Sequence, residues 1–358
     1  MKKTIAVGRR TFLAAMPAAG VVRAATRPKG VIDEYDPANL KLAHRTPWNA
    51  SDDELLFLKQ VGLRWVRLEY GAQDPGVDAL GKVQKRFASF GIGLYGAVHD
   101  SYRSLKIQLG QPGRDQDIET YRTFLRSCGK LGIRVAPYDF HPGNTYTTSM
   151  VERRGYRARQ FDLEEFRSRV EKQRFERKYS ADEIWATYTY FVKAALPVAA
   201  EAGVKMALHP DDPPLAEMNG VAKLFIDYDG YRRAEQIAAG SPAWGIRLCV
   251  GTWAEGGRAM GRDVFEMIRD FGGRGKLHDV DFRNVTATLP RFVETFPDDG
   301  YLDMYAVMKA LRQVRFSGSA VPDHVPELAG DKGIRKAGTA YCIASMRALL
   351  RRANEEVG

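Results

Sequence analysis

Residues 205–214 read KMALHPDDPP, a short apolar strand pattern that ends in a histidine and runs into a loop stiffened by prolines. Comparable strand patterns recur along the chain, at residues 40–44, 64–69, 94–99, 133–141, 205–209, 245–250, 276–285 and 317–324. Amphipathic helical patterns lie between them, at residues 52–61, 117–131, 181–202, 229–239, 263–271 and 304–314, with a last one at 338–354. This alternation predicts a parallel sheet with right-handed crossovers, and eight repeats in roughly 310 residues favour an α/β fold of the closed (β/α)8 barrel type.

The composition indicates a globular protein. Of the 358 residues, 44% are hydrophobic and 27% are charged, which excludes disordered, collagen-like and polytopic membrane chains. The net charge of +10 suits an acidic small substrate, and the absence of a basic stripe with interleaved aromatic residues predicts no nucleic-acid partner. The three cysteines form no CxxC pair, so neither a disulfide framework nor a zinc ribbon is expected.

The first 25 residues have the pattern of an export signal. Residues 2–10 are basic, residues 12–22 are apolar and small, and residues 22–24 offer a small-residue cleavage site. The pair Arg9-Arg10 followed by Thr11-Phe12-Leu13 resembles a twin-arginine signal, so we expect a periplasmic mature protein without a membrane segment. The alternative is an ordinary cytosolic N-terminus.

Residues 26–358 are expected to form one barrel domain. Residues 150–180, rich in Arg, Glu and Lys, interrupt the strand–helix rhythm after the fourth strand. We interpret them as an inserted, partly helical, lid-like segment over the barrel mouth. A solvated surface insertion is the alternative.

The six histidines are distributed in a way that favours an enzyme. Five of them end predicted strands, and His278 lies within the seventh strand; the five are His44, His99, His141, His209 and His324. The carboxyl ends of barrel strands line the active-site face, and imidazole is both a metal ligand and an acid or base near neutral pH.

Metal-binding donors also gather at these strand ends. Cys249 ends the sixth strand, Asp281 lies in the seventh, and Asp323 precedes His324 at the end of the eighth. Nitrogen, sulfur and oxygen donors on neighbouring strand ends can converge on one cation, and thiolate with imidazole favours a transition metal.

These motifs resemble the mannonate dehydratase family, and the resemblance covers nearly the whole mature chain. It includes residues 106–110, 138–140, 201–206, 292–294 and 299–304. The family lies among the xylose-isomerase-like TIM barrels. The resemblance implies a hydro-lyase of uronate and carbohydrate breakdown that uses Mn2+ or Fe2+ and converts D-mannonate to 2-keto-3-deoxy-D-gluconate. It also implies metal ligation by His209, Cys249 and Asp323.

The chain departs from the family at three positions. Asp281 stands where the family has a fourth ligand, a histidine. His278 lies three residues earlier, so alternation along a strand places it on the opposite face; we expect Asp281 to replace that ligand, with His278 as the alternative. Ile334 stands near an expected tyrosine, and Val325 stands where a glycine is usual.

Elimination of water requires a base, charge stabilisation and an acid for the departing hydroxyl. We assign proton transfer to His324; its alternative role is to hold Asp323 in place. Arg283 and Lys106 are candidates to bind the substrate carboxylate, or else they form ion pairs at the barrel rim. His99 and His141 are candidates to bind sugar hydroxyls.

Two other functions stay open: an exported isomerase, epimerase or eliminase acting on a uronate or oxidised glycoside, and a catalytically silent sugar-binding protein. The oligomeric state also stays open, a homo-oligomer included.

The export hypothesis predicts the behaviour of a precursor with Arg9→Lys and Arg10→Lys. The twin-arginine pair is the recognition element of this route, so the variant should stay unprocessed in the cytoplasm when cell fractions are immunoblotted. Processed variant outside the cytoplasm, in the same amount as the parent, would refute a twin-arginine signal.

Overall fold

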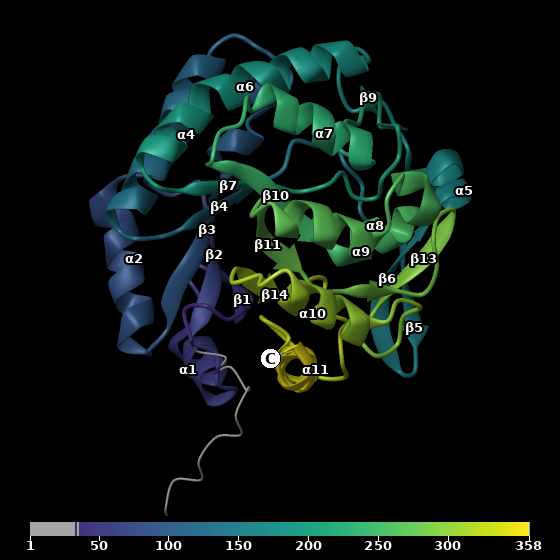
Figure 1. Cartoon of the computed structure of the whole chain (residues 1–358). Helices are drawn as coiled ribbons and strands as arrows, with labels where there is room; N and C mark the ends of the chain where they lie inside the picture. The colour runs from purple at the N-terminus through teal and green to yellow at the C-terminus, as the bar shows by residue number, and fades with distance from the viewer. Residues whose placement is uncertain (1–32, 34–35, 358) are drawn as a thin grey trace, which may run out of the picture.

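The computed structural model describes residue 33 and residues 36–357, so the signal segment expected at residues 1–25 lies outside the described residues. Eight parallel strands close into a barrel in the order β1-β14-β11-β10-β7-β4-β3-β2, as Figure 1 shows. They are β1 (Lys41–Pro47), β2 (Trp65–Gly71), β3 (Gly93–His99), β4 (Val135–Tyr138), β7 (Lys205–Leu208), β10 (Trp244–Cys249), β11 (Leu277–Asp281) and β14 (Ser319–Val321). The predicted (β/α)8 barrel is confirmed.

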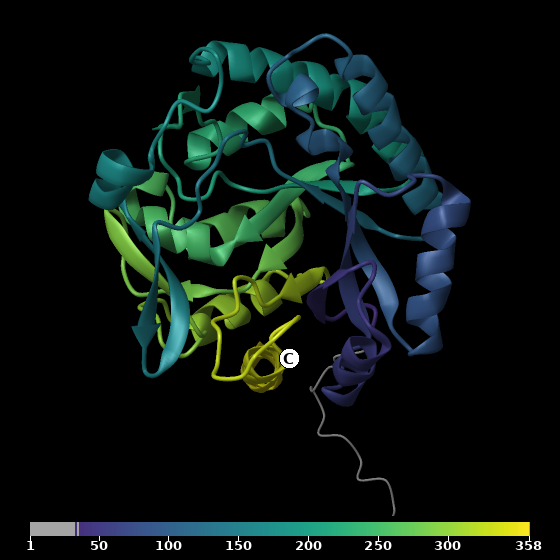
Figure 2. The same ribbon diagram turned by 180° about the vertical axis from the view of Figure 1, so that it is seen from behind.

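Helices surround the barrel on its outside, as the two opposite views in Figures 1 and 2 show. The longer ones are α1 (Asp52–Gln60), α2 (Val77–Ser89), α4 (Arg114–Lys130), α6 (Ala181–Glu201), α7 (Tyr228–Ile237), α10 (Met304–Gln313) and α11 (Lys336–Val357). Shorter ones are α3 (Leu105–Gln108), α8 (Val250–Gly256) and α9 (Val264–Met267). Within residues 36–357, no helix combines the length and the hydropathy needed to cross a bilayer.

Side-chain caps mark where some of the predicted helices begin. Helices α1 and α6 begin at Ser51 and Ser180, each of which forms a capping box with a glutamate three residues later. Helix α2, which was not among the predicted helices, follows Gly76, which provides no side-chain cap. Its start therefore carries no sequence signal of this kind.

The prediction of one strand over residues 276–285 is wrong in its second half. Strand β11 ends at Asp281, and β12 (Asn284–Val285) pairs antiparallel with β13 (Arg291–Thr295). The side-chain amide of Asn284 donates hydrogen bonds to the carbonyls of Pro297 and Leu302, which holds the chain away from the barrel. Asn284 and Val285 therefore belong to a separate sheet, and Arg283 lies in the connection before it.

The inserted segment is mainly a β-hairpin. Strands β5 (Ser149–Arg153) and β6 (Tyr156–Asp162) extend the sheet of β12 and β13 in the order β12-β13-β6-β5, at one side of the barrel in Figure 1. Helical structure follows only as α5 (Leu163–Glu165) and one π-helical turn (Phe166–Val170). Phe161 and Phe292 stack on neighbouring strands, with ring centroids 5.8 Å apart, and Phe166 packs against Phe161. The hairpin is thus fixed by strand pairing and by its own small core.

A network of buried charges crosses the inside of the barrel. Arg67 of β2 is fully buried, and its Nη1 lies 2.7 Å from Asp279 Oδ2 and 2.8 Å from Asp281 Oδ1. The Ser319 hydroxyl donates a hydrogen bond to Asp279, and Arg247 of β10 approaches Asp281 from another side. The network therefore connects β2, β10, β11 and β14, and it is specific to one strand register.

Replacing Arg67 should be strongly destabilising. The change Arg67→Met leaves two buried carboxylates without their shared guanidinium, which typically costs about 3–5 kcal/mol of unfolding free energy. The matched control is Arg126→Met, which removes a pair with Glu119 in which both side chains are more than two-fifths exposed. That change should cost less than about 1 kcal/mol. Urea denaturation followed by circular dichroism measures both, and equal losses would show that the buried network does not stabilise the barrel.

Candidate metal centre and active site

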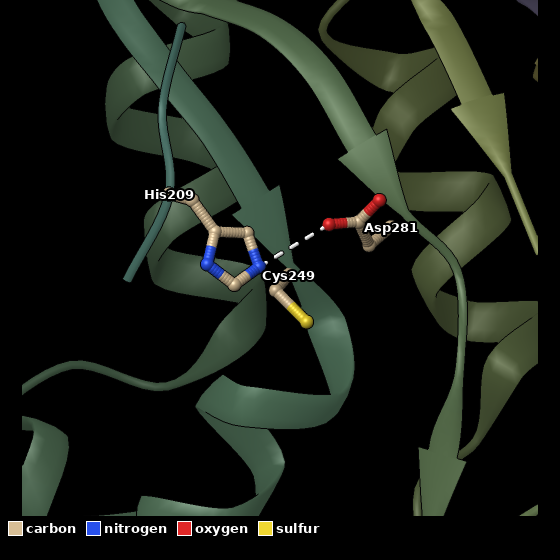
Figure 3. A group of neighbouring side chains, drawn as sticks. All are labelled: His209, Cys249 and Asp281. Atoms are coloured by element: carbon tan, nitrogen blue, oxygen red, sulfur yellow. Dashed lines mark ion pairs between the residues drawn. The ribbon is translucent and has the colours of Figure 1, made fainter. Parts of the chain in front are cut away.

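Three potential metal ligands meet at the carboxyl end of the barrel. His209 follows β7, Cys249 ends β10 and Asp281 ends β11, where it is the register partner of Cys249. One ligand atom from each lies within 4.8 Å of the others, and all three residues are buried (Figure 3). The carboxyl ends of adjacent parallel strands thus bring together one nitrogen, one sulfur and one oxygen donor.

The hydrogen bonds of His209 leave its outer nitrogen available as a ligand. Nδ1 lies 2.7 Å from the carbonyl oxygen of Pro210, so it donates its proton there, and Nε2 then carries a lone pair. Nε2 lies 3.3 Å from Asp281 Oδ2, the oxygen that also lies 2.6 Å from Arg247 Nε. Two ligand atoms each about 2.1 Å from a tetrahedral ion are separated by about 3.4 Å. The spacing of these two acceptors therefore fits a shared cation.

The third donor, Cys249, is fully buried. Burial raises the pKa of its thiol well above the ordinary value, despite the nearby guanidinium of Arg283, so the free side chain is protonated at neutral pH. Because metals bind the thiolate, binding at this position releases a proton. Asp281 is already ionised: burial alone would raise its pKa, but Arg247 and Arg67 hold that pKa well below the ordinary value.

Asp323, the fourth predicted ligand, lies nearby but outside this group of three. Its carboxylate is 3.4 Å from Arg45 Nη1, 3.4 Å from Arg283 Nε and 3.6 Å from His324 Nε2. Burial would raise its pKa, but His324, Arg45 and Arg283 together lower it. The structure thus brings Asp323 to the same cavity as an anion surrounded by cationic and imidazole groups.

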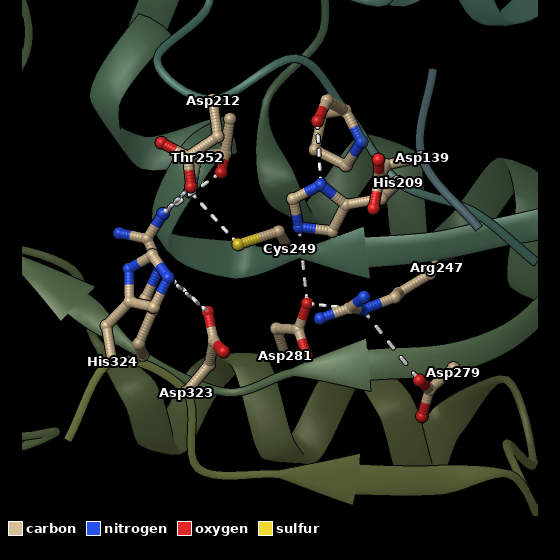
Figure 4. Close-up of polar contacts among 12 residues, drawn as sticks. Asp139, His209, Asp212, Arg247, Cys249, Thr252, Asp279, Asp281, Asp323 and His324 are labelled. Atoms are coloured by element: carbon tan, nitrogen blue, oxygen red, sulfur yellow. Dashed lines mark hydrogen bonds and ion pairs between the residues drawn. The ribbon is translucent and has the colours of Figure 1, made fainter. Parts of the chain in front are cut away.

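A polar cavity of about 350 Å³ opens beside these ligands, and Figure 4 shows several of its residues. Its lining is composed of aspartates, aromatic and imidazole rings, and arginines: Asp139, Asp212, Asp323, His141, Tyr146, His209, His324, Arg45, Arg103, Arg159 and Arg247. It therefore contains three of the six histidines and can bind a small, hydroxylated, anionic ligand.

Four rings follow one another around this cavity. The His141 ring lies 5.9 Å from His209 and 5.7 Å from Tyr146, and Tyr146 lies 6.4 Å from His324, measured between centroids. His141 Nε2 is 3.1 Å from Asp139 Oδ1, and burial lowers the pKa of His141. Tyr146 was not predicted, because it lies in an irregular loop after β4 where no periodicity marks its direction.

His324 occupies a backbone conformation that non-glycine residues rarely adopt, with φ at +45°. Its Nδ1 lies 2.8 Å from Glu294 Oε1 of β13. This hydrogen bond fixes the orientation of the ring, and Nε2 is the other nitrogen of the ring. Strained backbone held by surrounding contacts is typical of functional positions. The structure thus places His324 in the cavity, as predicted.

Three predicted substrate-binding residues do not reach the cavity, and their assignments require correction. His99 uses both ring nitrogens locally, at 2.8 Å from Ser101 Oγ and 2.8 Å from the Gln73 carbonyl. Lys106 lies half-exposed on α3, 3.6 Å from Asp117. Arg283 is buried beneath the site, where it pairs with Glu255 at 2.5 Å and with Asp212 at 2.8 Å.

The positively charged residues that do line the cavity are four other arginines: Arg45, Arg103, Arg159 and Arg247. Sequence reasoning missed all four. For Arg45 and Arg247 a signal existed, since each interrupts an otherwise mostly apolar strand pattern. Arg103 and Arg159 lie in a short helical turn and in the inserted hairpin, where the sequence carried no comparable signal.

Two other histidines lie away from these ligands. His278 lines a separate cavity with Tyr95 and Lys205, beside the first residues of β4 and β7, so the alternative assignment of His278 as a ligand does not fit the structure. His44 is buried with Nδ1 2.8 Å from Thr46 Oγ1, and burial lowers its pKa to about 4. His99 and His278 therefore correct the expectation that all the histidines serve one mouth, whereas His44 lines a further cavity that adjoins the first.

A second cavity, of about 440 Å³, adjoins the first. The two share Arg45, Arg159, Asp323 and His324 in their linings. Ile334 lines this second cavity. It stands near the position where the resemblance to the family implies a tyrosine. The space around His324 is therefore continuous with a further polar groove.

The closed barrel and the donors at its carboxyl end define a xylose-isomerase-like TIM barrel with a candidate metal centre. The profile of the D-mannonate dehydratase (UxuA) family matches residues 155–355, more than half of the chain. The chain belongs to this family.

Individual relatives agree with this assignment. The chain is 32% identical over 254 residues to mannonate dehydratase 2 of Halalkalibacterium halodurans, an alignment that covers 63% of this chain and 72% of the relative. It superposes on the crystal structure of mannonate dehydratase from Streptococcus suis serotype 2 with a TM-score of 0.79 and 26% identity, covering 89% and 96% of the two chains. A xylose isomerase domain protein from Planctomyces limnophilus shares the fold, with a TM-score of 0.58, 10% identity and coverage of 89% and 99%.

The ligand geometry predicts the effect of removing the thiol. In Cys249→Ala, the affinity for Mn2+ should fall by more than about 100-fold, because a ligand is lost and even indirect partners of metal ligands contribute about 10–100-fold. Isothermal titration calorimetry and elemental analysis measure this loss. The control is Cys128→Ala, another fully buried cysteine, on α4 and outside the cavity lining, which should retain the metal. Unchanged affinity in Cys249→Ala would remove the sulfur from the site.

Proposed function

We propose that this chain is a divalent-metal-dependent hydro-lyase that removes water from a sugar acid, D-mannonate or a close analogue, to give a 2-keto-3-deoxy acid. The observation that carries this proposal is the grouping of His209, Cys249 and Asp281 within 4.8 Å, beside a cavity rich in arginine and imidazole. Membership of the D-mannonate dehydratase family supports the same reaction class.

The proposed metal is Mn2+ or Fe2+. His209, Cys249 and Asp281 would hold it, with Asp323 as the nearest further carboxylate. The mixture of imidazole, thiolate and carboxylate suits these ions better than Mg2+, which prefers oxygen ligands. When bound, such an ion polarises substrate oxygens as a Lewis acid.

His324 is the proposed base. Its Nδ1 is held by Glu294, while Nε2 lies beside Asp323, within the cavity. In this arrangement Nε2 can take the proton from the carbon next to the substrate carboxylate, and Asp323 stabilises the imidazolium that forms. The hydrogen bond to Glu294 fixes the direction of the His324 ring within the cavity lining.

Tyr146 is the proposed acid for the departing hydroxyl. Burial, reinforced by the charges of Asp139 and Asp212, raises the pKa of its phenol, so the proton is present at neutral pH. Its oxygen lies 3.4 Å from His141 Nδ1, a nitrogen that accepts a hydrogen bond from the side-chain amide of Asn144, so the phenol regains its proton from solvent after each turnover. The hydroxyl leaves with the phenol proton as water, and the enol that remains tautomerises to the keto acid.

One observation favours a second candidate. The adjoining cavity beside Ile334 provides space for a substituent that a six-carbon acid lacks. This room suits an eliminase acting on an oxidised glycoside or a substituted uronate, in which an alcohol rather than water departs. The same base and the same metal would serve both reactions.

We also propose that the mature protein acts in the periplasm. The twin-arginine-like segment motivates this location. A twin-arginine route carries folded proteins, so a metal could be inserted before export.

Product analysis tests the proposed reaction. Purified protein with Mn2+ is incubated with a panel of aldonates, uronates and oxidised glycosides, and products are identified by NMR. A 2-keto-3-deoxy acid from an aldonate supports the dehydratase, and release of an alcohol supports the second candidate. An isomerised product with retained oxygen content, or binding without turnover, would contradict both.

Replacing the proposed base should lower turnover without removing metal. For His324→Asn, kcat is expected to fall about 10²-fold or more, which is the usual contribution of a general base. The matched control is His278→Asn, the same change at the other end of the barrel, where kcat should stay near the parent value. Kinetics and metal content are measured on the same samples. Near-normal turnover in His324→Asn, or loss of its metal, would show that His324 is not the base.

A further inference from the structure

Arg159 differs from the other three arginines of the cavity in its ion pairing. Arg45 pairs with Glu69 at 2.8 Å, Arg103 pairs with Asp139 at 2.7 Å, and Arg247 pairs with Asp281 at 2.6 Å. Within residues 36–357, the Arg159 guanidinium makes no ion pair and no side-chain hydrogen bond, although the side chain is partly buried. A partly buried arginine without an acidic partner has its hydrogen-bond donors available for a ligand.

The position of Arg159 is set by a rigid element. It lies in β6, opposite Met150 of β5, and the next residues of β6 pair with β13. It lines both adjoining cavities, together with Arg45, Asp323 and His324. The inserted hairpin therefore presents the guanidinium at the junction of the two cavities, beside the proposed base.

The charge of the cavity lining points to an anion. Of the four arginines that line the cavity, three are each paired with a protein carboxylate: Arg45 with Glu69, Arg103 with Asp139 and Arg247 with Asp281. Arg159 is the lining arginine for which the described residues provide no acidic partner. The carboxylate of a ligand can supply that partner, and a neutral sugar cannot.

We propose that Arg159 binds the carboxylate of the acid substrate and makes the site selective for sugar acids over neutral polyols and sugars. This inference rests on the proposed function for the identity of the substrate. The planar guanidinium can donate two parallel hydrogen bonds to a carboxylate. A carboxylate at the junction also places its neighbouring carbon beside His324, which is the carbon that loses a proton in elimination.

The kinetic test uses Arg159→Met, with Arg157→Met as the matched control. Arg157 lies on the same strand, is 61% exposed, is 3.8 Å from Glu327 and does not line either cavity. In Arg159→Met, KM for the sugar acid should rise about 10–100-fold, as expected for loss of charged hydrogen bonds, while kcat changes less. Arg159→Lys should recover part of the loss, and Arg157→Met should leave KM unchanged. Equal effects of Arg159→Met and Arg157→Met, or a fall in kcat with unchanged KM, would overturn the assignment.

A binding test separates this inference from the proposed reaction. Calorimetry compares D-mannonate with the neutral polyol D-mannitol, using the metal-loaded protein with the additional change His324→Asn, in which the acid stays unreacted. We expect a preference for the acid, and we expect Arg159→Met to abolish it without changing the affinity for D-mannitol. This outcome supports the role of Arg159 even if the parent produces no keto-deoxy acid, in which case only the proposed reaction fails. An acid preference that persists in Arg159→Met, or that is absent from the parent, overturns the inference.

Discussion

The ion pairs of Asp281 with Arg67 and Arg247 fix the geometry on which the site depends. All three residues are buried inside the barrel, and the two guanidiniums lie 2.8 Å and 2.6 Å from the carboxylate. Burying such charges has a large desolvation cost, which close pairing offsets, so the carboxylate is ionised and has one position. That position is the end of β11, where Asp281 faces His209 and Cys249 (Figure 4).

These pairs also account for how an ionised aspartate can stand at this buried position, where the resemblance to the family implies a histidine. An aspartate carries a negative charge that a neutral imidazole lacks, and Arg67 and Arg247 balance it. The oxygen near His209 Nε2 is the one that lies 2.6 Å from Arg247 Nε. The group of candidate ligands therefore includes a carboxylate whose charge the protein itself balances.

Sequence patterns predicted the elements whose periodicity is strong. Alternating strands and helices located all eight barrel strands, and the parity of β11 correctly separated Asp281 from His278. Patterns could not show where a side chain points once it leaves a regular element. His99 and Lys106 were placed in the cavity because they follow a strand end, but local hydrogen bonds and solvent hold them elsewhere. Arg283 lies beyond the last barrel residue of β11, where parity no longer applies.

The residues that sequence reasoning missed come from segments without such periodicity. Tyr146 lies in an irregular loop, and Arg159 lies in a hairpin whose partner, β13, is far away in the sequence. Two long-range contacts of β6 position Arg159 at the cavities that His324 also lines: its pairing with β13 and a backbone bridge from Arg157 to Glu327. The barrel and the donors at its strand ends thus follow from local pattern, whereas the position of Arg159 depends on how an insertion docks.

The absorption spectrum of the protein titrated with Co2+ tests the account of the metal centre most directly. Cobalt serves as a spectroscopic probe of the donors, because a bound thiolate produces a charge-transfer band in the near ultraviolet. We expect this band to grow with cobalt until one ion is bound per chain, since Cys249 lies within reach of the same ion as His209 and Asp281. Binding of one cobalt ion without the band would contradict it, because the metal would then lie outside this group of ligands.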